Sequence, residues 1–255
     1  MRQGRRVNWK ALLRSWDVQQ ESFNPLRERR FHVMLDVLAA TVPKRFTVLD
    51  LGSGPGSLSV RILRRFPGAR VVAVDYDPVT RRIGEGALGS MGGRLQWVDA
   101  KLGAPGWTAR LPAKKFDAAV STTALHWLEE DDLRRLYRDL GRLLRPGGVF
   151  LNGDHLPWGS EARGLAKLAE KVRKVRFRGV RLDHEWAAWT DWWKDAEKIP
   201  ALQPYFAEQK RRSAKHPRHG DTTLAVHEEA LKRAGFREVA VLWQDVTNRI
   251  LYARR

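Results

Sequence analysis

Four residues between positions 50 and 56 have the types and the spacing of a ligand-binding loop. Asp50 is followed by glycines at every second position, Gly52, Gly54 and Gly56. Because a glycine has no Cβ, it permits a tight turn and lets a ligand approach the backbone closely. An apolar run at 47–51 precedes the loop and helical spacing follows it over 57–66, so the loop joins a buried strand to a helix. The start of such a helix offers free N–H groups to an anionic group.

Two more acids stand at the ends of apolar runs. Asp75 ends the predicted strand 71–75, and Asp99 ends the predicted strand 93–99. A carboxylate at the end of the second strand can accept hydrogen bonds from both vicinal hydroxyls of a ribose. Asp75 lies 19 residues after Gly56, about one helix and one strand later. This spacing indicates a nucleoside ligand without saying which one.

The glycine loop resembles motif I of the class I S-adenosylmethionine (SAM) dependent methyltransferases, in which the loop wraps the amino-acid end of SAM. The dinucleotide fingerprint G-x-G-x-x-G fits less well, because its third glycine would fall at Ser57. Asp99 is similar to the family's adenine-site acid, although a loop-capping role is the alternative. The resemblance implies a set of cofactor-binding residues: Asp50, Gly52, Ser53, Gly54, Gly56, Asp75, Tyr76, Asp99, Ala100 and Ser121.

A second block of sequence strengthens the resemblance. The predicted strand 116–121 runs into a continuous helical pattern over 122–144, which Arg145-Pro-Gly-Gly148 ends before a strand at 149–153. The sequence S-x-x-A-L-H-W-L from Ser121, with the later L-L-R-P-G-G, is similar to small-molecule methyltransferases of the trans-aconitate methyltransferase type. The resemblance covers residues 47–153.

The family resemblance implies an α/β fold. We expect a Rossmann-like seven-stranded sheet of order 3-2-1-4-5-7-6, with the last strand antiparallel and helices on both faces. We expect residues 1–255 to form one methyltransferase domain. Its parts are an N-terminal helical cap (1–45), a SAM-binding core (46–155), a helical lid insertion after strand five (156–222), and a last helix with a closing hairpin (223–255).

Methyl transfer from SAM is an in-line displacement that needs positioning and exclusion of water. No nucleophilic triad is needed, and the seven histidines show no ligand spacing, so we expect no metal. His126, just past strand four, is the candidate catalytic base for a phenol or hydroxyl. It would orient a carboxylate substrate, which needs no base, and a packing role is the alternative. His155, at the end of strand five, is a second candidate.

The helical patterns at 7–17 and 27–38 supply further candidates for the pocket. The substrate-binding prediction consists of Trp16, Trp127 and His155. Gln19, Gln20 and Phe23 are expected near Trp16, and Arg29 or Arg30 is a candidate partner of the SAM carboxylate. The alternative is that these residues only pack the cap. In the lid, Trp186, Trp189 and Trp193 share one helical face, which suits a planar substrate or lid packing.

Composition bounds the partners. The chain has 255 residues, 43% hydrophobic, with no cysteine and no apolar run near the ~20 residues of a membrane helix. Its charged start lacks a secretory apolar stretch, so we expect a cytoplasmic protein without a membrane partner, as a monomer or homodimer. The net charge of +18 indicates either an anionic partner or arginine-rich coding, since 34 arginines outnumber 13 lysines.

Three hypotheses follow. The first is a SAM-dependent methyltransferase of a small anionic or aromatic molecule, with oxygen as the expected acceptor and S-adenosylhomocysteine (SAH) as product. The second is an RNA or DNA methyltransferase that uses the basic segments 163–181 and 210–218, although Ser121-Thr-Thr-Ala replaces the Asn/Asp-Pro-Pro-aromatic sequence of many base-modifying enzymes. The third is a non-catalytic SAM-binding interaction protein. A dehydrogenase is the most distant alternative.

Overall fold

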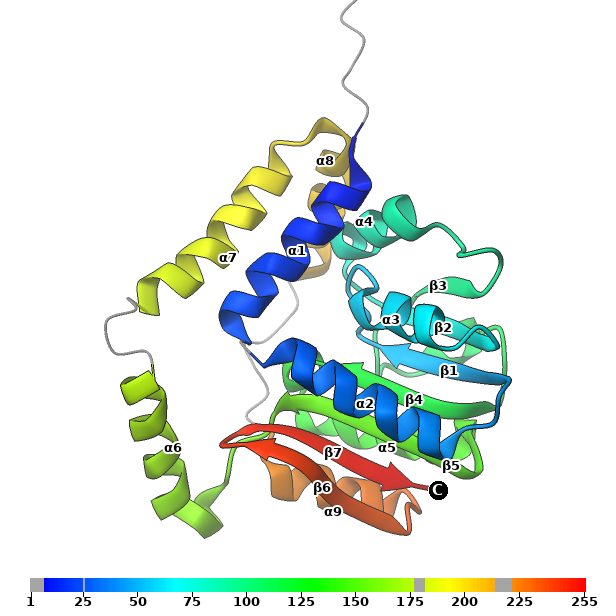
Figure 1. The fold of residues 1–255 in the computed structure, drawn as a ribbon, viewed down its shortest axis with the longest axis vertical. Helices are drawn as coiled ribbons and strands as arrows, with labels where there is room; N and C mark the ends of the chain where they lie inside the picture. The colour runs from blue at the N-terminus through cyan, green and yellow to red at the C-terminus, as the bar shows by residue number, and fades with distance from the viewer. Residues whose placement is uncertain (1–6, 25, 177–181, 214–221) are drawn as a thin grey trace, which may run out of the picture.

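The computed structural model describes residues 7–24, 26–176, 182–213 and 222–255. Within them, seven strands form one sheet of order β3-β2-β1-β4-β5-β7-β6, which confirms the predicted order (Figure 1). Strand β7 runs antiparallel to β5 and β6, and the other pairs are parallel. The strands are β1 Phe46–Leu51, β2 Ala69–Asp75, β3 Leu95–Asp99, β4 Phe116–Thr122, β5 Leu144–His155, β6 Glu238–Asp245 and β7 Asn248–Arg254.

Helices cover both faces of the sheet, as expected. On one face, α2 (Arg27–Thr41) and α3 (Ser57–Arg65) bury side chains such as Phe31 and Ile62 against the strands. On the other, α5 (Glu130–Leu143) and α9 (Leu224–Arg233) pack against the opposite side chains of the same strands. The strands are apolar on both faces because both faces are covered.

A third apolar cluster holds the remaining helices together beside the sheet. It joins α1 (Trp9–Phe23), α4 (Pro78–Leu88), α7 (Leu182–Glu197) and α8 (Gln203–Ser213). Ring contacts strengthen it, with the Trp16 ring centroid 5.0 Å from that of Trp192 and 5.9 Å from that of Trp193. Segments far apart in the sequence thus meet at one end of the sheet (Figure 1).

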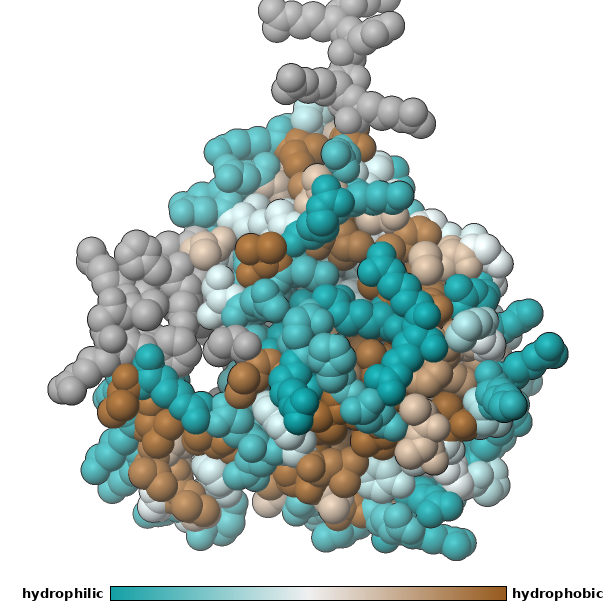
Figure 2. All heavy atoms as spheres, viewed as in Figure 1, coloured by the Kyte–Doolittle hydropathy of each residue, from teal (hydrophilic) through white to brown (hydrophobic). Residues whose placement is uncertain are grey.

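Helix α6 (Arg163–Arg176) packs less closely. Of its residues only Ala169 is buried, while Leu165, Leu168 and Val175 are 45%, 54% and 68% exposed. Hydrophobic atoms gather over this helix in Figure 2, at the lower left of the view. No helix in the described ranges has both the length and the apolar character to span a membrane.

The predicted helix over 122–144 is wrong in its first part. Thr123 has a positive φ of 52°, and a 3₁₀ turn at Leu125–Trp127 follows, so α5 begins only at Glu130. Acidic residues fill the first turn of α5, where their negative charges interact favourably with the positive end of the helix dipole and stabilise the helix. The irregular segment before α5 leaves His126 on a loop at the end of β4.

Two other predicted boundaries differ. Helix α2 lies on the sheet and only α1 lies over the glycine loop, because the apolar face of α2, which includes Phe31 and Met34, completes the sheet core. Residues 210–213 of the basic segment 210–218 belong to α8, and the rest of that segment lies outside the described residues. The side chains of Phe23 and Trp186 lie outside the described part of the chain.

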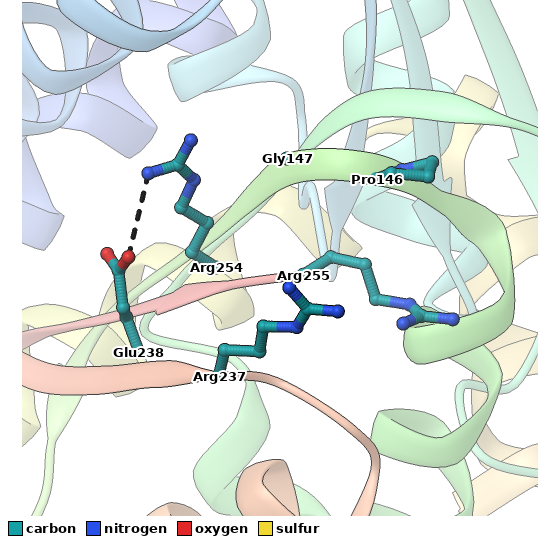
Figure 3. A pocket seen from close by; sticks show the side chains of 6 residues that line it. All are labelled: Pro146, Gly147, Arg237, Glu238, Arg254 and Arg255. Atoms are coloured by element: carbon teal, nitrogen blue, oxygen red, sulfur yellow. Dashed lines mark ion pairs between the residues drawn. The ribbon is translucent and has the colours of Figure 1, made fainter.

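A pocket of about 410 Å³ lies at the edge of the sheet opposite the carboxyl ends of the parallel strands (Figure 3). It is lined by Pro146, Gly147, Arg237, Glu238, Arg254 and Arg255. Arg254 reaches Glu238 at 3.6 Å. The pocket therefore shares no residue with the predicted cofactor site.

Gly52→Ala tests the tight packing of the glycine loop, with Gly92→Ala as its control. Both glycines have similar positive φ values, 67° and 69°, so alanine meets the same backbone strain of about 1 kcal/mol at each. Only at Gly52 would the new Cβ also lie 2.4 Å from Ala124 Cβ. We expect urea denaturation to show an additional loss of about 1–3 kcal/mol for Gly52→Ala. Equal losses would contradict this packing.

Candidate cofactor and acceptor site

The glycine loop folds back on the end of β2. The backbone N–H groups of Gly52 and Ser53 both donate to the carbonyl of Val74, at 2.8 and 3.1 Å. The N–H of Gly54 donates to Oδ2 of Asp75 at 2.6 Å. All three loop glycines have positive φ, 67°, 53° and 86°, which only glycine adopts without strain. The loop and the second acid are therefore one hydrogen-bonded unit.

Two carboxylates lie beside this loop, the buried Asp50 and the partly buried Asp75. Oδ2 of Asp50 accepts from the Ser59 hydroxyl at 2.5 Å, and burial raises the pKa of Asp50 to about 6. Oδ1 of Asp75 accepts from the N–H of Asp77 at 2.7 Å. Burial and then the charge of Asp77 raise the pKa of Asp75 to about 7. Each Asp75 oxygen has a second lone pair for a ribose hydroxyl.

Unsatisfied polar atoms near the loop fit the polar end of SAM. Oγ of Ser53, Oδ1 of Asp50 and the whole amide of Gln19 are buried without a hydrogen-bond partner among the described residues. Buried polar atoms are normally paired, so such a group needs an explanation. Together they offer acceptors to the ammonium of SAM and donors to its carboxylate. Trp16, three residues before Gln19 on α1, lies 3.9 Å from where a Cβ on Gly54 would stand.

At the far end of the predicted site, the structure pairs Asp99 with Asp75 across β2 and β3. Oδ2 of Asp99 accepts a hydrogen bond from Arg81 at 3.0 Å. Each carboxylate oxygen of Asp99 also accepts from a different terminal nitrogen of Arg212, on α8, at 2.8 Å. Burial opposes ionisation of Asp99, but the bonds from Arg212 and the charge of Arg81 leave its pKa below the usual value. Sequence reasoning missed Arg212, which lies 113 residues after Asp99 in the chain.

A histidine on the loop after β4 contacts a carboxylate of β5. Nδ1 of the His126 ring lies 2.8 Å from Oδ1 of Asp154, and the backbone N–H of His126 donates to Oδ2 of Asp154 at 3.3 Å. Burial lowers the pKa of His126, but the charge and hydrogen bond of Asp154 more than offset this and raise it above its ordinary value. The pKa of the fully buried Asp154 lies well below its usual range, held there by His126 and Arg30.

Sequence reasoning also missed Asp154. The residue directly follows the predicted strand 149–153, one position before His155, and strand-end acids are the signal that identified Asp50, Asp75 and Asp99. Applied to the fifth strand, the same rule would have found it.

Arg30 does not have the position expected of a cofactor ligand. Its guanidinium is fully buried and donates to Asn248 and Thr122, each at 2.9 Å, and to Thr123. Burial lowers the pKa of Arg30 to about 10. Arg30 therefore ties α2 to the ends of β4 and β7, where it also faces Asp154. Its neighbour Arg29 is exposed.

The other predicted residues have separate places. Ser121 is buried and its hydroxyl donates to the Leu51 carbonyl at 2.8 Å, so it links β4 to β1. Trp127 is 52% exposed, with its ring centroid 5.1 Å from that of His126. His155 is exposed, and its Nε2 lies 3.0 Å from Oδ1 of Asn24. Ala100 is buried directly after β3. Within the described ranges, no three His, Asp or Glu side chains form a metal-binding group.

Comparisons with known proteins agree with this geometry. Residues 48–148 match the family described as a methyltransferase domain. The chain is 35% identical to the trans-aconitate 2-methyltransferase of Azoarcus sp. over 137 residues, 53% of this chain and 49% of that protein. An O-methyltransferase family protein from Burkholderia thailandensis has a similar structure, with TM-score 0.55 and 19% identity over 91% of this chain and 58% of that one.

Human N-acetylserotonin methyltransferase in complex with SAM also has this fold, with TM-score 0.50 and 14% identity over 93% of this chain and 56% of that one. The sheet order defines a Rossmann-like fold, and the acids lie at the strand ends where open α/β sheets bind ligands. Over residues 48–148 the chain is similar to methyltransferase domains, and SAM is the cofactor of the class I methyltransferases that it resembles. It spans about half the length of the curated relatives it matches.

Binding of SAH is expected to weaken as the pH falls. With a pKa of about 7, Asp75 is ionised at about pH 8 and protonated at about pH 6. The protonated carboxyl group is uncharged, so it accepts weaker hydrogen bonds from the ribose hydroxyls. We expect calorimetry to give an affinity about tenfold lower at the lower pH. Asp75→Asn does not titrate and should bind weakly with little dependence on pH. An unchanged wild-type affinity over this range would contradict the prediction.

Proposed function

We propose that this protein transfers the methyl group of SAM to an oxygen of a small anionic or aromatic molecule. The observation that carries the proposal is the contact of 2.8 Å between His126, on the loop that packs against the glycine loop, and Asp154 of β5. Ala124, two residues before His126, would meet a Cβ added to Gly52. The candidate base and the cofactor loop are thus neighbours.

Different residues of the chain have different roles in the proposed reaction. SAM supplies an electrophilic methyl group with its leaving group already in place. Asp75 and the glycine loop position the nucleoside and amino-acid parts, and His126 accepts the proton of an acceptor hydroxyl at Nε2, because its Nδ1 faces Asp154. Asp154 fixes the ring and stabilises the imidazolium form that results. A carboxylate acceptor needs no base, and His126 would then orient it.

Two observations support an anionic or planar acceptor. Trp127, half-exposed beside His126, offers a broad apolar surface for a planar group. The similarity to a trans-aconitate 2-methyltransferase supports a small acid.

The described part of the basic segments carries ion pairs that reduce its attraction for nucleic acid. Lys210 pairs with Glu197 at 2.6 Å and Arg176 with Asp245 at 2.6 Å. We therefore favour the small-molecule acceptor.

Titration calorimetry with SAH, in parallel with NAD, tests the proposed cofactor. We expect micromolar binding of SAH, little binding of NAD, and loss of SAH binding in Asp75→Ala. Asp36→Ala is the matched control, since this acid is exposed and pairs only with Arg65 in the described contacts. Preference for NAD would refute the proposal. Label transfer from SAM to a panel of acids and phenols then separates an enzyme from a protein that only binds SAM.

The His126–Asp154 pair has a measurable signature that does not need the substrate. NMR titration should place the pKa of His126 above 6.5 in the wild type and below it in Asp154→Asn, because the buried neutral amide no longer stabilises the imidazolium. With a hydroxyl acceptor, His126→Gln should lower kcat about 100-fold, with little effect on the affinity for SAH. A His126 pKa unchanged by Asp154→Asn would contradict the role of Asp154.

A further inference from the structure

Arg212, near the end of α8, makes an unusual set of contacts with the predicted adenine end of the cofactor site. Its two terminal nitrogens each donate to a different oxygen of Asp99 at 2.8 Å. Its guanidinium carbon lies 4.5 Å from the centroid of the Tyr76 ring. One nitrogen also donates to the Tyr76 carbonyl at 2.5 Å. The guanidinium thus stacks on one cofactor-site residue while it binds another.

These contacts match those that adenine would make. Adenine is planar, stacks on an aromatic ring, and donates from its exocyclic amine to a carboxylate; a guanidinium is also planar, stacks on aromatic faces and donates in a fork. We infer that Arg212 occupies the adenine subsite and competes with the cofactor, so that SAM binds only when the end of α8 moves away. The inference rests on the proposed function, because it needs Asp99 and Tyr76 to bind adenine.

The packing of α8 would let this end move while the rest of the helix stays in place. Phe206, in the first half of α8, is buried in the apolar cluster with Leu13 and Ile83 of α1 and α4. The second half makes polar contacts, such as the bond from Gln209 to Asp77. Polar contacts at a partly exposed surface exchange readily for water. Release of Arg212 therefore leaves the buried half of α8 undisturbed.

The charged groups around Asp99 also permit the cofactor to replace Arg212. When Arg212 leaves, Arg81 still pairs with the Asp99 carboxylate at 3.0 Å, and Nη1 of Arg110 still donates to the Asp99 backbone carbonyl at 2.8 Å. Arg212 keeps Glu208, one helical turn earlier, as a partner. Neither the carboxylate nor the released guanidinium is left without an opposite charge.

Calorimetric titration of the full chain with SAH tests the inference. Arg212→Ala should bind SAH about tenfold more tightly than the wild type, which corresponds to a site blocked about nine-tenths of the time. Arg211→Ala, an exposed neighbour on the same helix, is the matched control and should bind as the wild type does. Added salt should tighten wild-type binding, by screening the Arg212–Asp99 pair, more than it tightens binding to Arg212→Ala.

Hydrogen exchange of the wild type provides a second measurement that needs no variant. Saturating SAH should speed exchange of the backbone amides at 209–213, and unchanged or slower exchange there would overturn the inference. Equal or weaker binding of SAH by Arg212→Ala would also overturn it, while wild-type binding would still uphold the proposed cofactor. If neither the wild type nor Arg212→Ala, both folded by circular dichroism, binds SAH, the proposed function fails as well.

Discussion

Parallel pairing of β1 with β2 on one side and β4 on the other is the constraint on which the rest of the molecule depends. It places the carboxyl ends of these strands at one edge, so the residues that follow each strand meet there. The register also sets Asp75 directly opposite Asp99 and Leu51 opposite Ser121. The candidate site residues on the core lie on or just beyond the carboxyl ends of strands β1 to β5. The helices on both faces exclude water from the strands.

Burial of charge at this edge is costly, and the structure offsets the cost by pairing. Asp154 and Arg30 are both fully buried, and each stabilises the charged form of the other. Removing one partner of such a pair is far more damaging than the pair is stabilising. The same Asp154 contacts His126, so the carboxylate that faces Arg30, the residue that ties α2 to β4 and β7, also orients the proposed base and raises its pKa. Structural and chemical roles are therefore coupled at the end of β5.

The cofactor half of the site depends on a different set of contacts. There the apolar cluster of α1, α4, α7 and α8 brings Trp16 to the glycine loop and Arg212 to Asp99. Helix α1 is also tied to the loop by polar contacts, since Asp17 accepts from the Ser57 hydroxyl at 2.6 Å. The predicted cofactor residues thus contact helices that lie outside the sheet, whereas the position of the proposed base depends on the sheet itself.

The sequence alone determined the glycine loop and the strand-end acids Asp50, Asp75 and Asp99, because strand, turn and helix patterns are local and parallel strands end at a common edge. The order of the strands in the sheet came from the family resemblance. It could not show that Arg30 is buried, or that the pattern over 122–144 is interrupted, since both depend on how separate elements pack. Only the tertiary structure paired His126 with Asp154, 28 residues away, and Arg212 with Asp99, 113 residues away. Contacts at such separations are set by which faces are buried together, and no local pattern records them.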